Sequence, residues 1–179
     1  MKPIYKYLST KIKNSKIRAT DKTIKKIVKD ELDRLGHNAD LNHIDVSRVT
    51  NMDSVFSCES FDLGPIYKDL NPDISHWDVS NVKHMQYMFS GCKNFNQDLS
   101  DWDVNNVEDM NSLLFGCRNF NQDLSQWNVS NVNIMSFMFY CCKNFNQDLS
   151  QWDVSNVLDH NYMFEECPIK EEYKPKFKK

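Results

Sequence analysis

Cysteine is the residue type with the widest chemistry in this sequence, and the chain holds six of them. Cysteines at equivalent places in neighbouring repeats can approach to the distance of a disulfide, and thiolates also bind zinc. Zinc sites use local C-x₂₋₄-C pairs, whereas the close pair here, Cys141 and Cys142, is adjacent. We therefore expect the repeated cysteines to be free thiols that act as small apolar side chains, and Cys141 to be the better candidate for a reactive thiol. The repeated set, which has Cys58 near its register, is Cys92, Cys117, Cys142 and Cys167.

Aspartates recur at the same interval and form a candidate acidic interaction surface. If the repeats stack like strands, neighbouring carboxylates lie about 5 Å apart and repel each other by about 1 kcal/mol or less in water. Backbone N–H groups in turns, adjacent glutamines or bound Ca²⁺ would offset that repulsion, and no EF-hand or nonapeptide calcium pattern is present. We therefore expect turn hydrogen bonds, and no metal or other cofactor. The row is Asp98, Asp123 and Asp148, preceded by Asp73.

Signatures of catalysis are missing from the sequence. It has no phosphate-binding loop, no glycine-rich dinucleotide turn and no G-x-S-x-G element, and its five histidines form no cluster with ligand spacing. We therefore expect a protein without enzymatic activity. Aromatic residues at positions that vary between repeats indicate an outer face, and they join the candidate interaction surface as Tyr87, Phe137 and Tyr140.

An internal repeat of 25 residues underlies these rows. The run Asn-Phe-Asn-Gln-Asp-Leu-Ser occurs at 94–100, 119–125 and 144–150. The tryptophans keep the same interval, in phase with apolar valines, so we expect their side chains to lie in the core. They are Trp77, Trp102, Trp127 and Trp152.

An imperfect copy precedes the clear ones. Residues 44–56 match 77–89 at an offset of 33 residues, so a surplus of eight residues belongs within 57–69, around Gly64 and Pro65. This makes five units, of which the first and last are atypical. Atypical ends are expected because an end unit has a neighbour on one side only.

Each unit predicts a short strand followed by a short helix or 3₁₀ turn. In one unit, 95–104 holds β-forming residues around the tryptophan, and 107–117 holds apolar residues at steps of three and four. Gly116 lies where such a helix would stop. Neither half buries its apolar face alone, so we expect stacking to join the strands into a parallel sheet with right-handed winding, an α/β fold.

The repeated words resemble the BspA-like repeat, also called the mycoplasma lipoprotein-type repeat, which is related to leucine-rich repeats. The resemblance rests on Phe-Asn-Gln-Asp-Leu-Ser-x-Trp-Asp-Val-Ser-Asn-Val, followed by Met, Met-Phe and Cys, and covers about 41–167. It implies a right-handed leucine-rich-repeat-like solenoid of about five strand–helix coils. It also implies a surface protein linked to adhesion and interaction, and it brings no catalytic residues.

The two ends differ from the repeats. Residues 20–36 predict an amphipathic helix that ends at Gly36, and residues 3–12 predict a further helix. The domain organisation expected is a basic helical N-terminal cap or docking segment at 1–40, repeats at 41–167 and a basic flexible tail at 168–179. The apolar face of the first helix is Ile24, Ile27, Val28, Leu32 and Leu35, and the candidate docking residues are Lys11, Lys13, Lys16, Lys25, Lys26 and Lys29.

The distribution of charge suggests the kind of partner. The net charge is +7 over 1–36, −13 over 37–167 and +3 over 168–179. We expect a basic protein partner to bind the acidic body. The negative charge of this body opposes the binding of nucleic acid. The alternative is a structural component that docks through its basic N-terminal segment onto a larger assembly such as a virion or cell envelope.

The cellular address and the oligomeric state stay open at this point. No apolar run is long enough for a transmembrane helix, and no apolar region of a signal peptide follows the first residues. The sequence therefore predicts a cytoplasmic or virion-associated protein, whereas the family resemblance implies the cell surface. A monomer and a dimer paired at an exposed strand edge are both compatible with the sequence.

Overall fold

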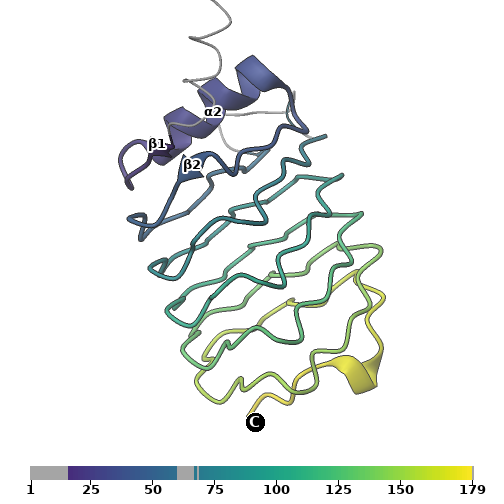
Figure 1. Ribbon diagram of the computed structural model, residues 1–179. Coiled ribbons are helices and arrows are strands. Elements are labelled where there is room, and N and C mark those ends of the chain that lie inside the picture. The colour runs from purple at the N-terminus through teal and green to yellow at the C-terminus, as the bar shows by residue number, and fades with distance from the viewer. Residues whose placement is uncertain (1–15, 60–66, 68, 179) are drawn as a thin grey trace, which may run out of the picture.

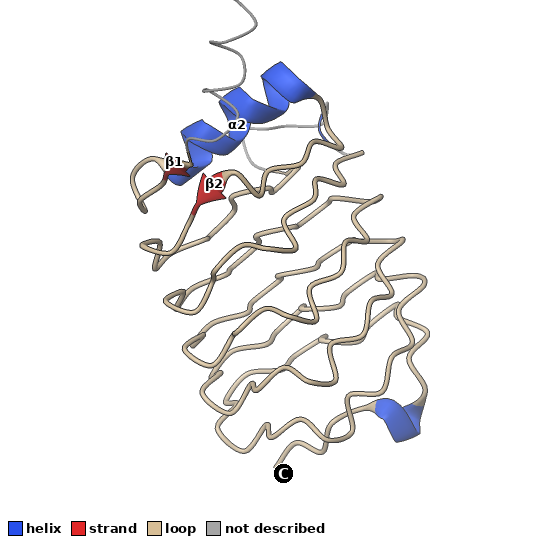
Figure 2. Cartoon of the chain, viewed as in Figure 1, coloured by secondary structure: helices blue, strands red, loops and turns tan. Residues whose placement is uncertain are grey.

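Regular secondary structure is sparse in this chain, of which a computed structural model describes residues 16–59, 67 and 69–178. Strand β1 (Ile17–Arg18) pairs in parallel with strand β2 (Ile44–Asp45). Helix α2 (Ile24–Leu35) lies between them in the sequence, and the 3₁₀ helix η2 (Glu171–Tyr173) lies near the C-terminus (Figure 2). No helix in the described part is long and apolar enough to cross a membrane.

The prediction of a leucine-rich-repeat-like solenoid of five strand–helix coils is wrong. Residues 70–167 contain no α-helix, and their β-pairing is limited to isolated bridged residues. The repeat units, built of turns and loops, lie side by side along the molecule (Figure 1). One row of isolated parallel bridges links successive units through Asn51, His84, Asp109, Ile134 and Asp159.

The apolar segment predicted to be helical forms consecutive tight turns. Leu113 donates its amide to Met110 O in its own unit, at 3.2 Å, whereas Leu114 donates to Met138 O in the next unit, at 3.1 Å. Between Met110 and Leu113, Ser112 has a φ of 52°, which is a left-handed backbone conformation that a right-handed helix does not contain. An α-helix satisfies its amides within one segment, whereas this alternation joins neighbouring units. Apolar residues at steps of three and four occur both in an α-helix and in these turns. The periodicity therefore could not distinguish the two arrangements.

The segment around each tryptophan is not a strand, because side chains join neighbouring units there. The backbone amide of Trp127 donates to Leu124 O in a turn of its own unit, at 3.1 Å. Its indole N–H donates to Leu99 O of the preceding unit, at 2.9 Å. The amide of Asn146 donates to Asn121 Oδ1 at 2.9 Å, and this contact also recurs from unit to unit. Side-chain ladders thus replace the expected backbone ladder.

A continuous apolar core runs through the units. Phenylalanine rings stack along it, with centroids 6.0 Å apart between Phe95 and Phe120 and again between Phe120 and Phe145. All four tryptophan side chains are buried. Aromatic stacking and burial of this kind add to the hydrogen bonds that hold neighbouring units together.

Helix α2 lies over the first unit (Figure 1). Ile24, Val28 and Leu32 are buried in the same core cluster as the repeats. Leu35, which the sequence pattern placed on that face, is 45% exposed. Lys11, Lys13, the helix predicted at 3–12 and the surplus around Gly64 and Pro65 lie outside the described residues.

Two acidic side chains attach α2 to the first unit. The Asp21 carboxylate accepts hydrogen bonds from Thr50 N at 2.7 Å and Thr50 Oγ1 at 2.8 Å. Burial raises the pKa of Asp21, but these bonds outweigh it and lower the pKa overall. Glu31, buried, pairs with Arg34 and lies 2.8 Å from His43 Nε2; the bond to Arg34 is the main reason that its pKa is lowered.

The C-terminal segment packs against the last unit. Ile169 and Pro175 are buried. The Tyr173 carbonyl accepts a hydrogen bond from Leu149 N at 2.8 Å, and the Phe177 ring stacks on His160 with centroids 3.8 Å apart. This segment therefore contacts one side of the last unit.

Candidate interaction surfaces

Five aromatic side chains form a row along the turn segments of the units, which we call the aromatic row. Phe115 stacks on Tyr140 with ring centroids 5.0 Å apart, and Phe137 stacks on Tyr162 at 5.1 Å. Phe137 also tilts against Tyr140 at 5.8 Å. Tyr87 is 44% exposed and Tyr162 is 61% exposed. Four of the five rings therefore pack against one another, and Tyr87 and Tyr162 have open faces.

Three of the five residues of this row have a backbone in the left-handed region. The φ angles of Tyr87, Phe137 and Tyr162 are 55°, 58° and 56°. Bulky side chains are uncommon there, and such a conformation costs about 1–3 kcal/mol. Serine occupies the same position in two other units, as Ser54 and Ser112, with φ of 57° and 52°. The turn therefore does not require an aromatic ring, so packing within the fold does not by itself explain the row.

A shallow depression of about 220 Å³ opens beside the row. Its apolar lining comes from Tyr87, Phe115 and Phe137. Polar side chains complete the lining, and these are Glu59, Ser90 and Ser112. The depression combines an aromatic wall with a carboxylate and hydroxyl groups, which suits a partner side chain more than a buried reaction centre.

The aspartate row forms turns. Asp98, Asp123 and Asp148 are exposed, and each accepts a hydrogen bond from the backbone N–H of the serine two residues later, at 2.9, 2.8 and 2.9 Å. The bond from the Ser100 amide lowers the pKa of Asp98, and the equivalent bond from Ser150 lowers the pKa of Asp148. None of the three lines the aromatic depression, so the two predicted parts of the interaction surface are not brought together there.

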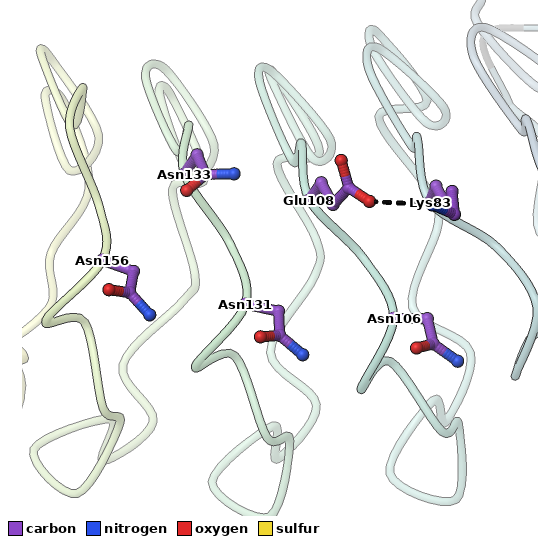
Figure 3. A pocket seen from close by; sticks show the side chains of 6 residues that line it. All are labelled: Lys83, Asn106, Glu108, Asn131, Asn133 and Asn156. Carbon is purple, nitrogen blue, oxygen red and sulfur yellow. Dashed lines mark hydrogen bonds and ion pairs between the residues drawn. The ribbon is translucent and has the colours of Figure 1, made fainter.

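A second, polar depression of about 410 Å³ crosses four neighbouring units (Figure 3). Its asparagines form a ladder: Asn131 Nδ2 donates to Asn105 O at 2.7 Å, and Asn106 and Asn156 make the equivalent bond at the same distance. Lys83 and Glu108 form an ion pair at 3.1 Å across two units. Asn133 completes the lining, which includes no cysteine, histidine or serine. The residues that line it therefore do not include a nucleophile next to a general base.

The described docking lysines lie on or beside α2. Lys26 pairs with Asp30 at 2.6 Å and Lys29 pairs with Asp33 at 2.5 Å. Lys16 and Lys25 are exposed. Ion pairs within the helix partly neutralise the face that a docking role would use.

The repeated cysteines are free in the structure. Cys117 Sγ, fully buried, donates to Phe89 O at 3.1 Å, and Cys92 and Cys142 make equivalent contacts at 3.0 and 3.1 Å. Burial raises the pKa of these three thiols, which disfavours the reactive thiolate. Cys141 is half-buried and has a φ of 58°, at the position that Gly116 occupies one unit earlier. Among the described residues no group of His, Cys, Asp and Glu could hold a metal ion.

Sequence reasoning missed three residues of interest. Phe115 and Tyr162 complete the aromatic row, and the repeat interval placed them one unit from Tyr140 and Phe137. Asp109 is nearly buried and accepts hydrogen bonds from Asn111 N and Gln86 Nε2, both at 2.8 Å. Burial raises the pKa of Asp109. No signal in its spacing marked this aspartate, because neighbouring units carry other residue types in the same place.

The family model described as "Mycoplasma protein of unknown function, DUF285" matches residues 26–69 and 63–175. No curated protein and no solved structure matches the chain.

Proposed function

Since the chain belongs to this DUF285 family of mycoplasma proteins of unknown function, we propose that it is a non-catalytic interaction or adhesion module that binds a protein partner on its aromatic row. The observation that carries the proposal is a set of packed aromatic rings, three members of which lie on a left-handed backbone. Rings at Tyr87, Phe137 and Tyr162 are held at positions where serine also serves the fold.

Aromatic side chains suit this role for physical reasons. They are enriched at the centres of protein interfaces and lose little conformational entropy on binding. Contacts within the row restrict Phe137 and Tyr140 before a partner arrives, which reduces the ordering that binding requires. The adjoining depression would receive a side chain of the partner, with Glu59 at its margin.

Charge supports a basic partner. Residues 37–167 carry a net charge of −13, and a surface of one sign speeds encounter with a partner of the opposite sign. Docking through the basic N-terminal segment has less support, because Lys26 and Lys29 are engaged in ion pairs within α2.

The finer relation to BspA-like repeat proteins is part of the same proposal. It rests on the repeated Asn-Phe-Asn-Gln-Asp-Leu-Ser run and on the tryptophan that follows it. Proteins with that repeat are linked to adhesion and interaction, which agrees with a binding role.

A photo-crosslinking amino acid of similar size, p-benzoylphenylalanine at position 137, tests the proposal. Irradiation in an extract of the source cells, followed by mass spectrometry, identifies a crosslinked protein, which is then purified for affinity measurements. Phe137→Ser and Tyr162→Ser each remove a ring and install the residue found at Ser112. We expect each to weaken binding at least tenfold, because interface aromatics often contribute more than about 1.4 kcal/mol.

Leu158→Ser is the matched control, because Leu158 is 85% exposed and lies outside the aromatic row. It should bind like the unaltered chain. Equal affinity of Phe137→Ser, Tyr162→Ser and the unaltered chain would contradict the proposal.

A further inference from the structure

Neighbouring units are joined by a fixed pattern of backbone hydrogen bonds. In the fourth unit, alternate amides donate to carbonyl oxygens of the fifth at 2.8–3.0 Å. The same four positions donate to the next unit throughout the preceding units. The donors in the fourth unit are Met135, Phe137, Phe139 and Cys141, and their acceptors are Asp159, Asn161, Met163 and Glu165.

In the part of the chain that the structure describes, the equivalent amides of the fifth unit have no following unit to receive them. Within the described chain, no hydrogen bond is made by the backbone N–H of His160, Tyr162, Phe164 or Glu166. We call this set of amides the terminal edge. An unpaired row of backbone donors at alternate residues is a template for a further chain segment.

The terminal edge keeps the conformation of the paired units. The intervening amides of Met163 and Glu165 donate to His160 O and Tyr162 O, both at 3.2 Å, as their counterparts do in earlier units. The φ of Tyr162 is 56°, and that of Phe137 one unit earlier is 58°. A segment that pairs with this edge would therefore meet donors that are already in place.

A groove of about 340 Å³ runs beside the terminal edge. One wall consists of edge residues, among them His160, Tyr162 and Phe164, and the other is formed by the C-terminal segment at Lys174 and Phe177. The two walls meet where the Phe177 ring stacks on His160, and Lys174 Nζ lies 5.9 Å from the centroid of the Phe164 ring. A segment that pairs with the terminal edge must therefore displace these two side chains.

The contacts between earlier units define what such a segment must carry. Phe137 stacks on Tyr162 at 5.1 Å, and Phe139 stacks on Phe164 at 5.5 Å. An added segment would thus place an aromatic residue on Tyr162 and, two residues later, an aromatic residue on Phe164. The units themselves have this motif, aromatic–Met–Phe, at 87–89, 137–139 and 162–164.

We infer that the terminal edge binds a segment of a protein partner with the aromatic–Met–Phe motif, which adds in parallel as one more unit. Basic residues around the motif favour binding to the acidic body of the chain. Residues 82–93 show both features, since they contain Tyr-Met-Phe, two lysines and no acidic residue. The inference concerns a surface that the proposed function does not use, apart from Tyr162.

A synthetic peptide with the sequence of residues 82–93 serves as the probe, added to the full chain. Amide exchange followed by NMR should show saturable binding and at least tenfold slower exchange at His160, Tyr162, Phe164 and Glu166. The amides of Met135 and Phe139 should be protected with and without peptide, which shows that the fold is intact. A peptide with serine in place of its Tyr and its Phe should bind at least tenfold more weakly.

The double variant Tyr87→Ser, Phe115→Ser separates this inference from the proposed function. It removes two rings of the aromatic row without removing Phe137, which stacks on Tyr162, and we expect it to bind the peptide within twofold of the unaltered chain. Three results would overturn the inference: no binding, binding without protection of the terminal edge, or protection of that edge by self-association of the free chain.

Discussion

The rings of Phe137 and Tyr162 stack with centroids 5.1 Å apart and an interplanar angle of 21°, although both residues have a left-handed backbone. This pair connects the two main features of the repeat units. The left-handed turn directs alternate amides to the next unit, and the same turn places a side chain on the outside. Positions of this kind therefore serve the stacking of units and also determine their surface.

Replacement of Cys141 by glycine should stabilise the protein by about 0.5–1 kcal/mol. A left-handed backbone costs an L-residue about 1–2 kcal/mol, part of which is offset by the greater freedom of glycine in the unfolded chain. Cys141 has a φ of 58°, whereas Gly91 and Gly116 fill the same place in other units. Urea unfolding followed by circular dichroism measures the difference.

Cys141→Ala is the control, because alanine keeps the Cβ atom and should bring no comparable gain. A Cys141→Gly variant that is no more stable than Cys141→Ala would show that this turn stores no strain.

Trp127→Phe should lower the free energy of unfolding by about 1–3 kcal/mol. The change removes the indole N–H that donates to Leu99 O at 2.9 Å and leaves a buried carbonyl without that partner. Chemical denaturation with near-ultraviolet detection reports the loss. An unchanged midpoint would mean that the tryptophan ladder does not hold the units together.

Asp109→Asn should gain stability relative to the unaltered chain as the pH rises through the folded pKa of Asp109. Burial raises the pKa of Asp109, so the folded state keeps a proton that the unfolded state has already released near its pKa of about 3.9. Stability from this group is therefore present at low pH and is lost as the pH rises through the folded pKa. The asparagine has no charge to bury, and Gln86 can rotate its amide to present an acceptor.

Asp98→Asn is a control of opposite sign. The bond from Ser100 N lowers the pKa of Asp98, so its stabilising contribution is present above the unfolded pKa and is lost on acidification. Urea unfolding at several pH values should show the two variants diverging in opposite directions from the unaltered chain. A pH-independent difference for Asp109→Asn would contradict the assignment.

Asp21→Ala should loosen helix α2 without unfolding the repeats. The carboxylate accepts three hydrogen bonds from the first unit, from Thr50 N, Thr50 Oγ1 and Asn51 N, and its loss should cost about 1 kcal/mol at this exposed position. Hydrogen exchange should become faster in 24–35 while the amides of 110–142 keep their protection. Equal acceleration in both regions would indicate that α2 and the repeats unfold as one cooperative unit.

Part of the candidate site could be read from the sequence. The interval of 25 residues relates Phe115 to Tyr140 and Phe137 to Tyr162, so the aromatic row could be predicted from the repeat. The terminal edge was not, because it consists of backbone amides, and every non-proline residue carries the same backbone donor. Only the hydrogen-bond partners of the earlier units show which amides are left over.

The sequence by itself determined the repeat interval, the residue types that recur in each unit and the helical character of 24–35. Side chains in equivalent surroundings recur at equal spacing, and an amphipathic helix is specified by contacts close in the chain. The tertiary structure alone decided that each unit consists of turns, and that the leucine-rich-repeat-like plan does not apply. The acceptors for alternate amides lie about one repeat away in the sequence. No local periodicity shows whether an amide will bond within its own turn or across to the next unit.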